Sequence, residues 1–154
     1  ALRPWTCVVA AVVGLGFGVR WVVVHDQPEF GRAFAAAARE VDRETPAIFF
    51  AGAYREFDAF FIHAPELQRR DPIDDASLPP EAIAVAMPLF ESWVRAQKAA
   101  GVTVFLTEGV FEYLKNPIGP HPETGPVLAR AYAETFHLAP IERGALRGFR
   151  VELR

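Results

Sequence analysis

The sequence has one cysteine, Cys7, and only two serines among its 154 residues. A single cysteine excludes a disulfide within the chain, and Cys7 lies in no spacing typical of a lipidation or metal site. Neither serine, Ser77 or Ser92, lies in a Gly-x-Ser-x-Gly motif, so the sequence indicates no hydrolase nucleophile. The scarcity of these residues removes the commonest signatures of nucleophilic catalysis.

Lysine is also rare, since Lys98 and Lys115 are the only two, and no Lys/Arg cluster is interleaved with aromatic residues. The formal net charge of the chain is −3. From His25 onward, 14 basic residues stand against 19 acidic ones, so this part carries −5. Such an acidic domain is a poor binder of nucleic acid, and we expect no nucleic-acid partner.

What the sequence does have is one long apolar stretch, Pro4 to Val24, whose only charged residue is Arg20. A helix of this length reaches roughly 30 Å at a 1.5 Å rise per residue, which matches the hydrocarbon thickness of a bilayer. Trp5 and Trp21 stand where aromatic rings favour the two membrane interfaces, and Arg20 can extend to the headgroups. The pattern predicts a transmembrane helix anchored by these three residues.

Ala10, Gly14 and Gly18 recur at four-residue spacing, so they share one face of that helix. Small residues on one face let a second helix backbone approach closely in lipid. We therefore predict that this face packs against another transmembrane subunit. Residues 1–26 are interpreted as a single-pass anchor, and residues 27–154 as a domain outside the cytoplasm, on the periplasmic side.

Two alternatives compete with the membrane span. A cleaved signal peptide has a shorter apolar core and a small-residue cleavage site, and Trp21 to Val24 does not supply one. The other alternative is a pair of buried strands, Cys7–Val13 and Val19–Val24, in a soluble nucleotide-binding protein. The glycines of Gly14 to Gly18 follow a Gly-x-Gly-x-Gly spacing, which lacks the third glycine of the dinucleotide-binding fingerprint.

The rest of the chain predicts a small three-layer α/β domain with a mostly parallel sheet and a C-terminal antiparallel hairpin. Helices are expected at Glu29 to Glu44, at Glu81 to Ala99 with a kink or break at Pro88, at Glu108 to Leu114, and at Val127 to His137. Strands are expected at Ala47 to Ala51 and Val102 to Leu106, and a hairpin with its turn near Gly144 closes the chain. Tyr54 to His63 fits helix or strand, and Gln68 to Pro80 is predicted to be a loop.

No catalytic, cofactor-binding or metal-binding residue is predicted. The four histidines lack the ligand spacing of a metal site. Tyr54 to Asp58 is the stretch where polar groups crowd after a buried strand, which is where α/β sheets keep ligand sites. We interpret it as an ion-paired surface helix. The phenylalanines are expected in the core, and any that prove exposed would form a membrane-facing or partner-facing patch.

Four segments carry a family resemblance: Trp21 to His25 at the end of the apolar stretch, Thr45 to Phe50, Gly101 to Leu106 and Gly148 to Leu153. In order and hydrophobic pattern the chain resembles the last membrane helix and C-terminal periplasmic α/β domain of GT-C type lipid-linked-sugar glycosyltransferases. The resemblance implies a periplasmic domain. In that family the catalytic aspartate lies in an early loop between membrane helices, so no catalytic residue is carried over to this sequence.

Two functions follow from the sequence. The first is a non-catalytic, single-span accessory subunit that stabilises a larger membrane complex, photosynthetic or respiratory, with its outer domain bracing partner subunits. The alternative is the C-terminal domain or relic of a GT-C type membrane glycosyltransferase. For that alternative, a lipid-linked sugar is expected near Tyr54 to Asp58.

Overall fold

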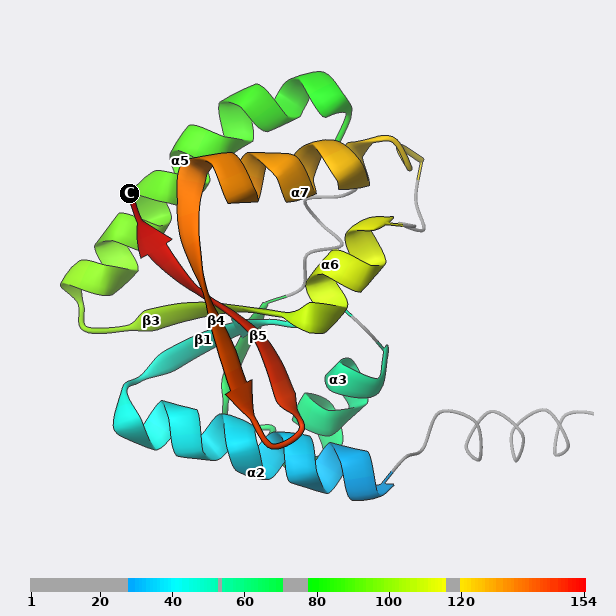
Figure 1. The fold of residues 1–154 in the computed structure, drawn as a ribbon, viewed down its shortest axis with the longest axis vertical. Coiled ribbons are helices and arrows are strands. Elements are labelled where there is room, and N and C mark those ends of the chain that lie inside the picture. The colour runs from blue at the N-terminus through cyan, green and yellow to red at the C-terminus, as the bar shows by residue number, and fades with distance from the viewer. Residues whose placement is uncertain (1–27, 53, 71–77, 116–119) are drawn as a thin grey trace, which may run out of the picture.

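The computed structural model describes residues 28–52, 54–70, 78–115 and 120–154. These residues form an α/β domain in which helices cover both faces of a five-stranded mixed sheet (Figure 1). The elements in chain order are α2 (Pro28–Glu44), β1 (Ala47–Phe50), α3 (Tyr54–Asp58), η1 (Ala59–His63), β2 (Gln68–Arg70), α5 (Pro80–Ala99), β3 (Thr103–Thr107), α6 (Glu108–Lys115), α7 (Thr124–Thr135), β4 (Phe136–Arg143) and β5 (Leu146–Leu153). The predicted α/β class is confirmed.

The sheet has the strand order β2-β1-β3-β5-β4. Strand β1 pairs in parallel with both β2 and β3, whereas β5 runs antiparallel to both β3 and β4. The prediction of a mostly parallel sheet was therefore wrong, because half of the strand pairs are antiparallel. The reason lies in the C-terminal hairpin, whose second strand inserts between β3 and β4 and places Arg150 opposite Phe105.

The C-terminal hairpin itself is confirmed. Strands β4 and β5 pair over their whole length, from Phe136 opposite Leu153 to Arg143 opposite Leu146. The turn contains Gly144 at φ +55°, a left-handed conformation that glycine adopts without a steric penalty. On β5, Val151 is buried while Arg150 points into a more exposed setting, as the alternation of apolar and charged residues predicts.

Strands β1 and β3 are buried on both faces, which explains why their sequences are continuous apolar runs. Phe49 and Phe105 stack with ring centroids 5.4 Å apart on the face covered by α2, α3 and η1. Ile48 and Leu106 point to the opposite face, which α5, α6 and α7 cover. The molecule thus has two apolar layers, one on each side of the sheet.

Helix α2 begins at Pro28, where a proline is expected at the first helical position, and its apolar face is buried as the sequence pattern predicts. Arg39 on this helix bonds Glu66 at 2.6 Å and also donates to the carbonyl oxygen of His63. The hydrogen bond from Arg39 lowers the pKa of the Glu66 carboxyl below its ordinary value. The ion pair between Arg39 and Glu66 thus connects α2 to the segment that follows η1.

A kink or a break was predicted at Pro88, and the break does not occur, since helix α5 is continuous through this residue. The helix changes direction part-way along (Figure 1). Pro88 lies on the exposed side of the helix, where water can solvate the carbonyl left without a donor. The predicted stop at Gly101 is confirmed. Gly101 adopts φ +76°, and the amide of Val102 donates to the carbonyl of Gln97, which closes the helix end.

Three local predictions need revision. Tyr54 to His63 is helical, as α3 followed by the π-helical turn η1. Strand β2 lies inside the predicted loop, since the polar residues Gln68–Arg70 have no apolar alternation and are held by backbone pairing with β1. Helix α7 begins at Thr124 and ends at Thr135, earlier at both ends than predicted. His137 therefore lies in β4 and does not end a helix.

The predicted anchor, residues 1–26, lies outside the described residues, and so does the start of the predicted outer domain. Within residues 28–52, 54–70, 78–115 and 120–154, none of the helices combines the length and the apolar character that a membrane crossing requires. The transmembrane helix therefore stays a prediction from the sequence.

Candidate functional site

The residues that the sequence singled out as an interface and as membrane anchors are absent from the described part of the chain: Ala10, Gly14 and Gly18 for helix packing, and Trp5, Arg20 and Trp21 for the membrane boundary. Their roles stay predictions. The polar stretch after β1 is described, and it lies at the edge of the sheet where β1 and β3 both end. In α/β folds this edge carries the ligand sites.

Glu56 is the centre of this edge. Glu56 belongs to the short helix α3, which follows β1, and it is only 3% exposed. The hydroxyl of Thr107 donates to Oε2 at 2.5 Å, and the amide of Gly52 donates to the same oxygen at 3.3 Å. The amide of Gly109 donates to Oε1 at 3.1 Å. The carboxylate thus joins the loop after β1 to the end of β3 and the start of α6.

The local sequence explains why a carboxylate is tolerated there. Helix α6 begins at Glu108, directly after β3, so the amide of Gly109 in its first turn has no partner inside the helix and donates to Glu56. The positive end of the helix dipole also favours a negative group at this place. Gly52 brings the loop close enough: a Cβ there would lie 2.5 Å from both Gly109 O and Val110 Cα.

This arrangement is suited to holding the sheet edge together. A general acid or base needs a free oxygen that faces a reacting group. Both oxygens of Glu56 instead accept hydrogen bonds from the protein itself, and Thr107 is buried beside them. The interpretation of this stretch as a surface helix was therefore wrong for Glu56. It holds for Arg55, which is exposed and lies 3.9 Å from Glu112.

A cavity of about 220 Å³ opens next to Glu56. Phe30 from α2, Arg55 and Arg147 line it together with Glu56 and Glu108. The Arg55 guanidinium lies 5.0 Å from the centre of the Phe30 ring, and Arg147 pairs with Glu142 at 2.9 Å. The cavity therefore offers cationic and anionic groups side by side, and it is smaller than the usual pocket for a drug-sized ligand.

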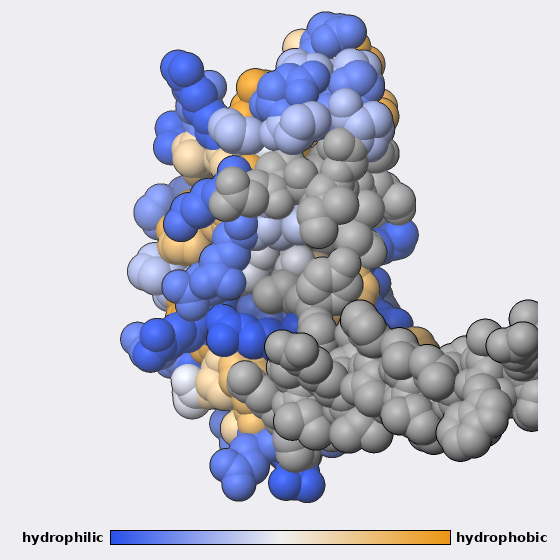
Figure 2. All heavy atoms as spheres, turned by 90° about the vertical axis from the view of Figure 1, so that its right-hand side faces the viewer, coloured by the Kyte–Doolittle hydropathy of each residue, from blue (hydrophilic) through white to orange (hydrophobic). Residues whose placement is uncertain are grey.

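Figure 2 looks onto this edge of the domain. Its coloured surface is mostly hydrophilic, with smaller hydrophobic areas between the charged ones. A broad apolar area is not visible on the coloured part of this face. The coloured part of this face is thus mainly hydrophilic, in keeping with the mixed charges around the cavity.

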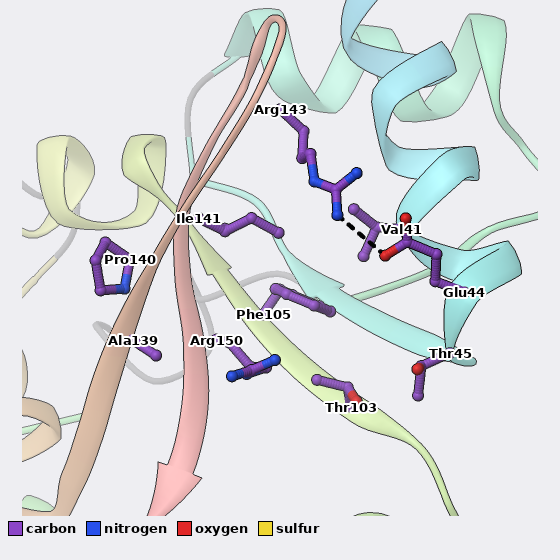
Figure 3. A pocket seen from close by; sticks show the side chains of 10 residues that line it. All are labelled: Val41, Glu44, Thr45, Thr103, Phe105, Ala139, Pro140, Ile141, Arg143 and Arg150. Atoms are coloured by element: carbon purple, nitrogen blue, oxygen red, sulfur yellow. Dashed lines mark hydrogen bonds and ion pairs between the residues drawn. The ribbon is translucent and has the colours of Figure 1, made fainter.

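A second cavity, of about 210 Å³, lies at the opposite end of the parallel strands (Figure 3). Glu44 at the end of α2 and Arg143 on β4 pair across it at 3.2 Å, and Ile141 points inward beside them. A third, of about 390 Å³, lies between α5 and the sheet and is lined by Lys98 and Arg150. The cations of the second cavity are paired: Arg143 with Glu44, and Arg150 with Glu152 at 2.6 Å.

No cluster of three or more histidine, cysteine, aspartate or glutamate side chains suited to a metal ion occurs within the described ranges. His121 and Glu123 approach to 3.3 Å in an exposed setting, and His137 lies 3.9 Å from Glu152 across the hairpin. Each of these is a pair and supplies too few ligands for a structural zinc site.

Sequence reasoning found the stretch that contains Glu56 but missed its partners. Thr107 and Gly109 are more than fifty residues away in the chain, and no spacing links them to Glu56. One signal was present: the apolar run of β3 ends in a polar residue, Thr107, and a glycine, Gly52, comes shortly after β1. Together they mark the edge where both loops meet.

Comparison with known proteins adds no relative: no family model, no curated protein and no solved structure matches the chain.

Proposed function

We propose that this chain is a non-catalytic, single-span accessory subunit of a larger membrane complex. Residues 4–24 anchor it in the bilayer, and the α/β domain stands outside the cytoplasm and braces its partner subunits. The observation that carries the proposal is the engagement of Glu56. The buried carboxylate, at the edge where such folds keep ligands, accepts hydrogen bonds on both oxygens and joins the loop after β1 to the end of β3 and the start of α6.

The position of α2 supports the same proposal. Because α2 precedes β1 and lies against the sheet, its first residue is found at the edge where β1 and β3 end. Phe30, in the first turn of α2, lines the same cavity as Glu56. A membrane span that ends shortly before Pro28 would therefore bring this edge, and not the opposite one, to the membrane surface.

The test is co-purification of the tagged full chain in mild detergent. Gly14→Leu and Gly18→Leu place bulky side chains on the predicted packing face, so each should reduce the amount of partner recovered. Val12→Leu is the matched control, because residue 12 lies about 200° around the helix from residue 10, on the opposite face. Unchanged partner recovery with both glycine variants would contradict the proposal.

A second candidate is the C-terminal domain of a GT-C type membrane glycosyltransferase. The cavity beside Glu56 favours it, because Arg55 and Arg147 could bind the polar part of a lipid-linked sugar at the membrane-facing edge. Native mass spectrometry of the chain purified from membranes separates the candidates. A retained lipid-linked sugar that is lost in Arg147→Gln supports the glycosyltransferase, and co-purifying membrane subunits support the accessory protein.

A further inference from the structure

Two neighbouring apolar side chains on η1 are open to the surroundings. Phe61 is 69% exposed and Ile62 is 59% exposed, whereas Phe60 just before them is fully buried. The π-helical turn lies directly after α3 and takes up more residues per turn than an α-helix, and such turns are frequent at functional sites. Two consecutive large apolar side chains that are exposed to water lower the solubility of a protein. Their exposure indicates a surface that a binding partner or a membrane covers in the functional state.

This pair lies beside the start of α2. A Cβ at Gly31 would lie 2.6 Å from the His63 ring, and the rings of Phe34 and Phe60 meet edge to face at 5.3 Å. Therefore η1 packs on the first turns of α2, next to Pro28. Three residues, 25–27, lie between Val24, the end of the proposed span, and Pro28, so the Cα atoms of Val24 and Pro28 are at most about 14 Å apart.

Arg69 gives this surface a cation. Its guanidinium lies 5.0 Å from the centre of the Phe61 ring and 5.8 Å from that of Phe57. Arg69 as a whole is partly exposed. A partly exposed guanidinium beside aromatic rings suits the binding of a phosphate group.

We infer that Phe61, Ile62 and Arg69 form a bilayer-docking surface, on the same membrane that holds the anchor. Phe61 and Ile62 enter the interfacial region, and Arg69 binds the phosphate of an anionic lipid headgroup. The inference rests on the proposed function, since it needs residues 4–24 in the membrane. The short connection to Pro28 selects lipid as the occupant, because it holds η1 within reach of the headgroups.

Another exposed apolar pair provides the contrast. Val85 is 69% exposed and Leu89 is 68% exposed on α5, which covers the opposite face of the sheet. They match Phe61 and Ile62 in exposure but are not next to the start of α2. If exposed apolar side chains adsorbed to lipid without regard to position, both pairs would behave alike.

The test uses spin labels on the full chain in a Cys7→Ser background. Phe61→Cys reports the docking surface, Val85→Cys is the matched control, and Val12→Cys reports the anchor. The protein is reconstituted in vesicles of phosphatidylethanolamine with or without phosphatidylglycerol. Collision with oxygen, which concentrates in lipid, is compared with collision with a water-soluble nickel chelate.

We expect the oxygen-to-nickel ratio at position 61 to exceed that at position 85 several-fold, with position 12 highest. Omitting phosphatidylglycerol should lower the ratio at position 61, and Arg69→Gln should abolish that dependence.

Equal ratios at positions 61 and 85, with position 12 in lipid, would overturn the docking surface and leave the anchor standing. Shielding of position 61 from both reagents would also overturn it, in favour of a second copy of the chain. A water-like ratio at position 12 would overturn the proposed function as well.

Discussion

Glu56 shows how a single residue can decide what a site does. A buried carboxylate is costly unless it is hydrogen-bonded, and here two backbone amides and one hydroxyl supply the bonds. The sequence indicated a polar stretch after β1, but burial of Glu56 depends on Gly52 and Gly109 being close in space. Tertiary proximity of this kind leaves no pattern in the sequence.

Thr107→Val tests the structural role of this carboxylate. Valine has the shape of threonine but no hydroxyl, so Glu56 Oε2 loses its shortest bond. We expect the domain to lose about 1–2 kcal/mol of unfolding free energy, measured by urea denaturation of the full chain in mild detergent.

Thr103→Val is the matched control, because Thr103 stands at the other end of β3 and is half-buried. Its replacement should change the unfolding free energy by no more than about 0.5 kcal/mol. Equal losses for the two variants would show that the bond to Glu56 adds nothing to the strand's stability.

At the scale of elements, periodic apolar patterns were the reliable signal. They predicted α2, β1, β3, α6 and the hairpin β4–β5 within a few residues, since each buries one face or both. The pattern failed for β2, whose residues Gln68–Arg70 are polar and pair through their backbone with β1. It also failed for strand direction, because the insertion of β5 beside β3 is a property of the whole sheet.

The contact between the loop after β1 and helix α6 gives the next prediction. Gly52→Ala would place a Cβ 2.5 Å from Gly109 O, and backbone on both sides leaves no flexible atom to move. We expect a loss of about 1–3 kcal/mol in unfolding free energy and shifted amide resonances in α6.

Gly101→Asn serves as the control for this substitution. Nothing lies within 4 Å of a Cβ at Gly101, and asparagine tolerates its left-handed backbone. A small loss at Gly101 beside a large one at Gly52 supports the close contact. Undisturbed α6 resonances in Gly52→Ala would contradict it.

On the scale of the whole molecule, the proposed span connects to the folded domain through the start of α2. If residues 4–24 cross the membrane as we propose, the edge with Glu56, Arg55 and the neighbouring cavity lies on the membrane side, with η1 beside it. The opposite edge, where Glu44 pairs with Arg143, then faces away from the bilayer. In this proposal the domain's orientation follows from where α2 begins.

Alkaline carbonate extraction of membranes from cells that produce the full chain tests this account most directly. We predict that the chain stays in the membrane pellet. Val12→Arg combined with Leu15→Arg, which costs about 5–7 kcal/mol of insertion energy at the span centre, should release it to the supernatant. Release of the unmodified chain by carbonate, to the same extent as the double variant, would contradict the membrane anchor and the orientation that depends on it.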